Sequence, residues 1–278
     1  MTAEHDVDVE QADERFREWM RGNLARAAEH FGLTVVGEPA WGWRLRTIGA
    51  SASGPTGPRW LRVVTEFPEW ARGDTWTGNT DANSLVGLAK PRVLGVLEWD
   101  EQNWRRQRAE VMTLLPGRAV SPTNHLRTMV DLPDSWWAEL RRSVDALRST
   151  PTGRVYTSQE AVSKRVRVAF GEDVRIDRWE TVHGDLHFEN LLAPQFGFLD
   201  WEMWGCGPAG TDAASLLLHS LLVPEVADRV RRTFAGMLDT PDGRKAQLAV
   251  AARLLARIDD GDYPELDQPL RRHLHTLG

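Results

Sequence analysis

The amino-acid sequence predicts a two-lobed α+β protein, with a sheet-rich first lobe and a mainly helical second lobe. The chain has 278 residues, enough for one large domain or two small lobes. Apolar residues before position 115 recur mostly in short β-prone runs, whereas those after position 117 recur mostly at helical spacing. The segment Leu115-Pro-Gly117 separates the two patterns. We therefore expect a sheet-rich lobe over 1–117 and a mainly helical lobe over 118–278.

The first lobe is predicted to begin with a helix over 15–31, because its large apolar residues recur every three or four positions. Five strands are then expected, at 33–36, 43–48, 59–64, 91–99 and 107–115. A short helix over 80–89 would interrupt them. Short connections between neighbouring strands favour an antiparallel sheet of five strands with one intervening helix.

The second lobe is predicted to contain helices over 135–148 and 158–170, and four more apolar-periodic segments after Gly210. Its exception is a small strand pair near the middle. Residues 191–193 and 197–199 are short apolar runs joined by a turn that contains Pro194, which indicates a hairpin.

Composition excludes several classes of protein. The 34 basic and 40 acidic side chains give a net charge of -6, so the chain lacks the basic excess typical of nucleic-acid binding. A single cysteine, Cys206, can form neither an internal disulfide nor a thiolate metal cluster. The first ten residues lack an apolar run, and no stretch is long enough to span a membrane. We expect a cytoplasmic protein, monomeric or homodimeric.

The most informative segment runs from His183 to Asn190, with the sequence His-Gly-Asp-Leu-His-Phe-Glu-Asn, and is followed by the hairpin and Asp200. Asn190 enters the first strand of that hairpin and Asp200 leaves the second, so the two side chains should meet at its open end. One oxygen from each suits Mg²⁺, which binds a few hard oxygen ligands together with substrate phosphates. Asp185, on the loop just before, could accept a hydroxyl proton near a metal-held phosphate.

This spacing of His, Asp and Asn before a metal-binding Asp resembles the catalytic loop of eukaryotic-type kinases. The wording His-Gly-Asp-Leu-His-x-x-Asn, together with Leu-Asp-Trp-Glu202, resembles more specifically the aminoglycoside phosphotransferase and choline kinase-like family. The stretch Gly205-Cys-Gly-Pro208 and Asp212 extend the resemblance. It implies a bilobal, protein-kinase-like fold, with a nucleotide-binding lobe over 1–117 and a catalytic and substrate-binding lobe over 118–278, and an enzyme that transfers phosphate from a nucleotide to an alcohol group.

The resemblance also implies roles for individual residues. Asp185 would be the base that orients the acceptor hydroxyl, and His183 would support the loop. Asn190 and Asp200 would hold Mg²⁺. The nucleotide triphosphate would be ATP or GTP.

Residues of the first lobe match the family's nucleotide site more loosely. The segment 37–43 lies where the family's nucleotide loop would fall, with Trp41 and Gly42 as candidates, although an ordinary turn would explain it too. Arg62 matches the cation that contacts the phosphates, because no lysine precedes Lys90 and arginine can bind phosphate oxygens bidentately.

Two further nucleotide contacts are expected. Asp81 is the nearest acidic partner for the cation, with Glu66 and Glu69 behind it, although a helix-capping role explains Asp81 equally well. The end of the last strand resembles the family's hinge to the nucleotide base. The candidates there are Met112, Leu114 and Leu115.

The acceptor should contact the second lobe. A run of carboxylates after position 258 would suit a cationic antibiotic, although a solvated loop explains it as well, and the chain carries 13 Trp, two of them beside the metal-binding Asp. The candidates are Trp201, Glu202, Trp204, Asp259, Asp260 and Asp262. The expected acceptor is an aminoglycoside-like antibiotic, or alternatively a sugar, nucleoside or amino alcohol.

Two other functions remain open from the sequence. His183 and His187 could be part of a metal hydrolase site, although such a site would leave Asn190 and Asp200 unexplained. A kinase-shaped binding module without turnover would account for the missing lysine of the first lobe, but it would have no need for an intact Asp185.

Overall fold

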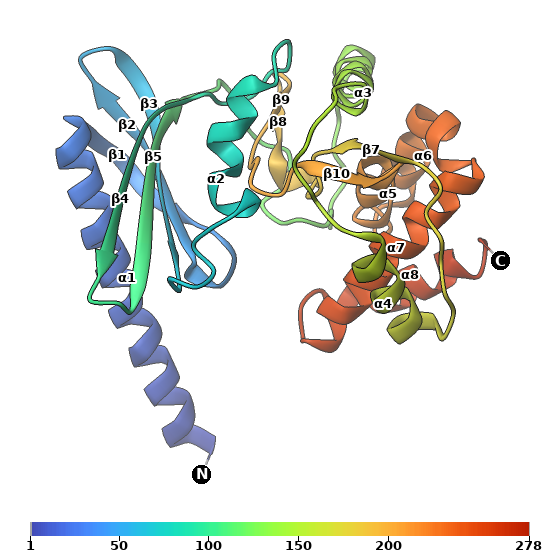
Figure 1. Cartoon of the computed structure of the whole chain (residues 1–278), viewed down its shortest axis with the longest axis horizontal. Coiled ribbons are helices and arrows are strands. Elements are labelled where there is room, and N and C mark those ends of the chain that lie inside the picture. The colour runs from blue at the N-terminus through green and yellow to red at the C-terminus, as the bar shows by residue number, and fades with distance from the viewer. Residues whose placement is uncertain (1, 278) are drawn as a thin grey trace. The chain divides into compact units, whose positions relative to one another are not determined.

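A computed structural model describes the backbone of residues 2–277 and the side chains of 10–277 (Figure 1). The chain forms two compact units. The first contains the residues up to Asn83 together with Pro91–Leu115, and the second contains Ser84–Lys90 together with the residues from Pro116 onward. The expected lobes, 1–117 and 118–278, place residues 84–90 in the first lobe, and their end residues 1 and 278 lie outside the described residues.

The first unit is built on an antiparallel sheet of five strands in the order β1-β2-β3-β5-β4 (Figure 1). The strands are β1 (Thr34–Trp41), β2 (Thr47–Gly54), β3 (Gly57–Glu66), β4 (Val93–Glu101) and β5 (Arg105–Thr113). Helix α1 (Thr2–Phe31) packs against this sheet, and the short helix α2 (Asp74–Asp81) follows β3. The fold is the predicted α+β class with a five-stranded antiparallel sheet.

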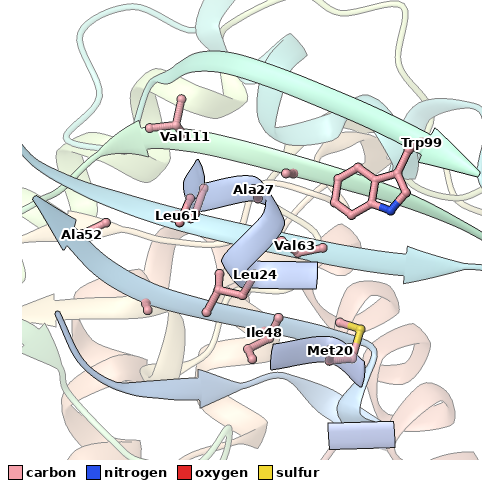
Figure 2. Packing of buried hydrophobic residues seen from close by; sticks show 12 residues of the cluster. Met20, Leu24, Ala27, Ile48, Ala52, Leu61, Val63, Trp99 and Val111 are labelled. Atoms are coloured by element: carbon pink, nitrogen blue, oxygen red, sulfur yellow. The ribbon is translucent and has the colours of Figure 1, made fainter. Parts of the chain in front are cut away.

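A dry core joins α1 to the sheet (Figure 2). Met20, Leu24 and Ala27 recur at three- and four-residue steps, which places them on one face of the helix. Ile48 and Leu61, from adjacent strands, are fully buried against the same core. Burying one such aliphatic side chain contributes roughly 1.5–3 kcal/mol, so this helix face attaches α1 to the sheet.

The region between the first two strands differs from the prediction. Residues up to Trp41 belong to β1, with a bulge between Val36 and Ala40 where Pro39 cannot donate to the ladder. The chain reverses through the 3-10 turn η1 (Trp43–Leu45), so the strand expected at 43–48 begins only at Thr47. Residues 37–41 of the expected nucleotide loop 37–43 therefore belong to β1, and the role of this segment in binding nucleotide stays a prediction.

The intervening helix is also shifted. Helix α2 covers Asp74–Asp81 and continues into the 3-10 turn η2 (Ala82–Ser84), whereas 80–89 was expected to be helical. Residues Ser84–Lys90 belong to the second unit, where the backbone N–H of Phe198 donates to the carbonyl of Ala89 at 2.7 Å. This hydrogen bond helps to hold an irregular segment, with a bend at Gly87 (φ 77°), where apolar spacing indicated a helix.

The second unit is mainly helical, as predicted. Its helices are α3 (Asp134–Arg148), α4 (Gln159–Phe170), α5 (Thr211–Leu218), α6 (Pro224–Leu238), α7 (Pro241–Asp259) and α8 (Asp267–Leu274), with 3-10 turns η3 (Phe188–Asn190) and η4 (Pro264–Leu266). Helix α7 packs against α4, α5, α6 and α8. None of the helices described between residues 2 and 277 combines the length and apolarity that a membrane span requires.

Two small antiparallel sheets position the motif residues in this unit. One has the order β6-β8-β9, from β6 (Arg118–Ala119), β8 (Leu191–Ala193) and β9 (Gly197–Phe198). The other pairs β7 (Trp179–Val182) with β10 (Gly205–Pro208). Strands β8 and β9 form the predicted hairpin, and its turn contains a cis peptide bond before Pro194.

Candidate active site

A buried carboxylate fixes the backbone of the loop that follows β7. Asp212, at the start of α5, accepts the backbone N–H of His183 at 2.8 Å and that of Gly184 at 3.0 Å. Burial raises the pKa of Asp212 to about 7, although the two N–H donors oppose this shift. Gly184 has a φ of 83°, a left-handed conformation that glycine adopts without strain. The loop geometry therefore depends on Asp212 and Gly184.

His183 supports this loop without reaching solvent. Its ring is fully buried, and Nε2 lies 2.8 Å from the carbonyl oxygen of Leu199. The ring also packs edge-on against Trp201, with centroids 4.7 Å apart. Burial lowers the pKa of His183, so the ring is neutral. A buried imidazole that is bonded to a carbonyl does not fit the alternative of a metal hydrolase.

Asp185 is bound on both carboxylate oxygens. Its Oδ2 lies 3.3 Å from His187 Nε2, and its Oδ1 lies 3.5 Å from the Nη2 of Arg253 on α7. His187 in turn lies 3.0 Å from the amide nitrogen of Asn124. Burial alone would raise the pKa of Asp185, but His187 and Arg253 outweigh it and hold this pKa well below its ordinary value. Asp185 is therefore an ionised, oriented carboxylate.

The hairpin brings the two predicted metal ligands to its open end. The backbone N–H of Leu199 donates to the carbonyl of Asn190 at 2.8 Å, so Asp200 follows directly after this pair. The Asn190 side chain donates through Nδ2 to the carbonyl of Asp185 at 2.9 Å. Asp200 is exposed and has a φ of 54°, and within residues 10–277 its carboxylate makes no hydrogen bond or ion pair.

The charges around this open end suit a divalent cation. Burial is the main cause that raises the pKa of Glu189; nearby His187 opposes this rise, and the carboxylates of Asp185 and Asp200 add to it. The donor set of Asn190 and Asp200 consists of an amide and a carboxylate, the hard oxygens that Mg²⁺ prefers. No three His, Cys, Asp or Glu side chains among residues 10–277 form a metal-binding group on their own. The residues present therefore fit a cation that takes its other ligands from phosphates and water.

Arg253 was not identified from the sequence. Its Nη1 donates to the hydroxyl of Tyr156 and to the carbonyl of Gly184, both at 3.0 Å, while Nη2 faces Asp185. Tyr156 packs so closely on β10 that a Cβ at Gly207 would lie 2.8 Å from its ring. The glycines of the Gly205-Cys-Gly-Pro208 stretch thus have a structural reason, because they let the tyrosine that holds Arg253 approach the strand.

The residues predicted to contact the acceptor differ in their exposure to solvent. Trp201 and Trp204 are only 2% and 3% exposed, so these indoles belong to the core and do not line an acceptor pocket as expected. The Trp204 ring packs instead under the guanidinium of Arg154, 4.7 Å from its centroid. Glu202 is half-buried close to the same arginine, whose Nη2 donates to the Glu202 carbonyl at 3.3 Å.

The acidic run after α7 is mostly solvated. Asp259 and Asp260 are exposed, whereas Asp262 is half-buried and lies 3.5 Å from the Nη1 of Arg257. Glu265, which follows this run, lies 2.7 Å from His125 Nε2, and the charge of Asp262 contributes to the raised pKa of neighbouring Tyr263, of which burial is the main cause. The run is therefore divided between solvent and the surroundings of Tyr263.

In the first unit, Arg62 belongs to a buried polar cluster centred on Glu110. The two residues face each other across β3 and β5, and Arg62 Nη1 lies 3.3 Å from Glu110 Oε2. Glu110 also accepts hydrogen bonds from Asn79 at 2.9 Å and from Arg108 at 2.9 Å. The sequence missed Glu110, whose alternation with apolar neighbours in β5 was the available signal, and the expected pairing of Asp81 with Arg62 stays a prediction. Asp81 accepts a hydrogen bond from the Thr77 hydroxyl at 2.6 Å.

The other nucleotide candidates lie along the sheet. Trp41 pairs with Ile48 in the β1–β2 ladder, and its ring packs on the core of the first unit, with the guanidinium of Arg21 5.6 Å from the centroid. The Gly42 N–H donates to the carbonyl of Thr47 at 2.8 Å. Met112 is buried at the end of β5. Leu114 is exposed and Leu115 is half-buried.

Comparison with known proteins decides the family. A model of the phosphotransferase enzyme family matches residues 82–247, well over half of the chain. This protein belongs to the phosphotransferase enzyme family. The matched region contains the catalytic loop, Asn190, Asp200 and Asp212. The predicted enzyme class, a phosphotransferase with an alcohol group as acceptor, is therefore confirmed. Comparison with curated protein sequences gives no match.

Solved structures share the fold at low sequence identity. A thermostable mutant of the aminoglycoside phosphotransferase APH(4)-Ia, solved with ADP and hygromycin B, is 13% identical with a TM-score of 0.59, covering 91% of this chain and 97% of that one. The amicoumacin kinase hAmiN, solved with AMP-PNP, Ca²⁺ and amicoumacin, is 15% identical with a TM-score of 0.55, covering 92% of each chain. A choline/ethanolamine kinase family protein from Mesorhizobium loti is 12% identical with a TM-score of 0.55, covering 94% and 93%. These likenesses confirm the predicted kinase-like fold.

Proposed function

We propose that this phosphotransferase moves the terminal phosphoryl group of ATP or GTP to a hydroxyl of a small molecule, either an aminoglycoside-like or other antibiotic, or a sugar, nucleoside or amino alcohol. The observation that carries the proposal is the placement of Asp185 beside the open end of the β8–β9 hairpin. There the ionised carboxylate of Asp185 adjoins Asn190, and Asp200 follows the second strand of the hairpin. Solved relatives of the same fold that contain nucleotides and small hydroxylated compounds support it.

Asp185 would orient the acceptor by accepting a hydrogen bond from its hydroxyl. A carboxylate with a depressed pKa is a weak base, so it takes the proton late, when the oxygen has already begun to bond to phosphorus. His187 and Arg253 hold the two carboxylate oxygens in fixed directions. Holding a reacting group in one orientation lowers the barrier because less motional freedom is lost in the transition state.

The negative charge of the nucleotide phosphates requires positively charged groups that bind it. Asn190 and Asp200 would hold Mg²⁺, which supplies positive charge to the phosphate oxygens when it is bound. In the first unit, Arg62 would contact phosphate oxygens while Glu110 keeps its guanidinium oriented. Met112, Leu114 and Leu115 stay our candidates for contacts with the nucleotide base.

The proposal is tested by removing the Asp185 carboxylate. Purified protein with Mg²⁺ and ATP or GTP should phosphorylate at least one member of a panel of hydroxylated antibiotics, sugars, nucleosides and amino alcohols, as measured by product mass. Asp185→Ala should lower the transfer rate by about 10²–10⁴-fold, with nucleotide affinity unchanged. Asp228→Asn, which removes an exposed carboxylate on α6, is the matched control. Undiminished transfer by the Asp185 variant would contradict the mechanism.

A further inference from the structure

Tyr263 is half-buried in the loop that follows α7, and its ring begins a series of ring contacts that leads to Asp185. The centroid of the Tyr263 ring lies 5.2 Å from that of His125 and 6.4 Å from that of His219. The His219 ring lies 5.5 Å from the ring of His187, whose Nε2 is 3.3 Å from the Asp185 carboxylate. The fold therefore brings Tyr263 into the surroundings of Asp185, although the two are distant in sequence.

The backbone of Tyr263 is held in a conformation that tyrosine seldom adopts. Its φ is 56° and its ψ is 42°, which is the left-handed region. A bulky side chain makes this region unfavourable, and the residue before a proline, here Pro264, normally takes an extended conformation. Backbone strain of this kind persists where surrounding contacts impose it, and it is concentrated at binding and catalytic sites.

Contacts on both sides of Tyr263 impose the strained conformation. Before it, Asp262 lies 3.5 Å from the Nη1 of Arg257, and the Asp262 N–H donates to the Arg257 carbonyl at 2.9 Å. After it, Glu265 Oε1 lies 2.7 Å from the Nε2 of His125, whose ring also contacts Tyr263. These contacts fix the backbone that carries the phenol, so little freedom of motion is lost when this group binds a ligand.

The Tyr263 hydroxyl is not used within the described part of the chain. Among residues 10–277 it makes no hydrogen bond. Burial is the main cause that raises the pKa of this hydroxyl. The carboxylates of Asp185 and Asp262 add to the rise, and Arg257 and Arg253 oppose it. The phenol is therefore protonated near pH 7, and its oxygen lies within the electrostatic reach of Asp185.

The other tyrosine of the chain uses its hydroxyl differently. The sequence contains two tyrosines, and the Tyr156 hydroxyl accepts a hydrogen bond from Arg253 Nη1 at 3.0 Å. That contact has a structural purpose, because Arg253 in turn faces Asp185. The Tyr263 hydroxyl holds no such group in place, so it is available to a ligand that binds beside Asp185.

We propose, on the basis of the proposed function, that Tyr263 binds the acceptor. Its hydroxyl hydrogen-bonds a polar group of the bound compound, while Asp185 orients the hydroxyl that receives the phosphoryl group. A phenol both donates and accepts hydrogen bonds, and it offers a flat apolar face to a ring. Tyr263 thus determines the affinity for the acceptor and takes no part in the transfer itself.

The proposal is tested by removing the hydroxyl and keeping the ring. The acceptors are those that the wild-type protein phosphorylates from a panel that includes hygromycin B, ethanolamine, fructose and uridine. In Tyr263→Phe the KM for these acceptors should rise about three- to tenfold, because a neutral hydrogen bond is lost. The kcat, the KM for nucleotide and the melting temperature should stay unchanged. Ser149→Ala, which removes an exposed hydroxyl at the end of α3, is the matched control.

The outcomes separate this proposal from the proposed function. An unchanged KM for every acceptor in Tyr263→Phe would overturn the role of Tyr263 and leave the phosphotransferase activity standing. If the wild-type protein phosphorylates no compound of the panel, the proposed function fails and the role of Tyr263 fails with it.

Fluorine NMR supplies a measurement that does not depend on turnover. Protein labelled with 3-fluorotyrosine should give one signal for each of the two tyrosines, and Tyr263→Phe assigns them. Adding an acceptor to protein that already holds a non-hydrolysable nucleotide should shift the Tyr263 signal in a saturable manner and leave the Tyr156 signal nearly unchanged. A Tyr263 signal that does not respond to saturating acceptor would overturn the proposal.

Discussion

The Asp185 side chain is oriented by one group that is near in the sequence and by one that is distant. His187 is two residues away, whereas Arg253 lies 68 residues later on α7. Arg253 is itself fixed by the Tyr156 hydroxyl and the Gly184 carbonyl. Burial raises the pKa of the Tyr156 hydroxyl and so keeps it protonated. The orientation of the carboxylate therefore depends on a guanidinium that makes three contacts at once.

Arg253→Lys should lower kcat by about 10–100-fold and leave the KM for nucleotide unchanged. An ammonium cannot reproduce three contacts from one planar fork, and a charge-assisted hydrogen bond contributes roughly 1.5–3 kcal/mol. Steady-state kinetics of Arg253→Lys and Arg253→Ala would measure the loss, and added guanidinium should partly restore Arg253→Ala. Arg244→Lys, exposed on the same helix, is the control. Losses that follow a fall in melting temperature would instead indicate a purely structural role.

Among helices and strands, the predictions from sequence patterns were confirmed where interactions between residues close in sequence determine the structure. The β8–β9 hairpin was predicted from two apolar runs and a proline turn, and α3 and α4 begin within one residue of their expected starts. The strand expected at 43–48 and the helix expected at 80–89 were wrong. In both segments tertiary contacts decide the backbone: the ladder of β1 on β2 in the first, and pairing with the hairpin in the second.

The same distinction applies to the site. The catalytic loop and hairpin lie within 18 residues, from His183 to Asp200, so spacing alone could indicate Asp185, Asn190 and Asp200. Glu110 was missed because its contact with Arg62 depends on the register of β3 against β5. A single sequence does not determine strand register, so such cross-strand partners are found only in the structure.

Docking of α8 on α7 should depend on pH. His273 on α8 is buried, its Nε2 lies 2.9 Å from Gln247 Oε1 on α7, and burial with nearby Arg231 lowers its pKa to about 4. An unfolded histidine titrates near pH 6.5. The unfolded chain therefore binds more protons between these values, and stability falls as the pH drops from about 6.5 to 4.

His273→Gln should remove this dependence. Urea unfolding at pH 7 and pH 4.5 should show that the wild-type protein loses up to roughly 3 kcal/mol more unfolding free energy than the variant over this interval. His275→Gln, at the end of the same helix, is the control. Equal acid destabilisation of the wild type and His273→Gln would contradict the assignment.

Across the whole molecule, buried and half-buried carboxylates are often paired with arginines, although the net charge is negative. The chain carries -6, yet Glu265 is paired with Arg127 in the second unit, and Glu110 in the first unit is surrounded by Arg62, Arg108 and Asn79. At the open end of the hairpin the carboxylates of Asp185 and Asp200 add to the effect of burial in raising the pKa of Glu189, although His187 opposes them. A positive charge on a ligand should therefore favour binding at the open end of the hairpin.

Stabilisation by nucleotide should for this reason require a divalent cation and the Asp200 carboxylate. A ligand that binds only the folded state at 100 times its dissociation constant adds about 2.7 kcal/mol. Thermal melts with ATP or GTP should show a clear rise in melting temperature with Mg²⁺ that EDTA removes. Asp200→Asn should lose most of that metal-dependent increment, because a neutral amide attracts the cation less strongly, whereas the exposed-site control Asp228→Asn should keep it. An undiminished Mg²⁺-dependent rise in Asp200→Asn would place the cation elsewhere.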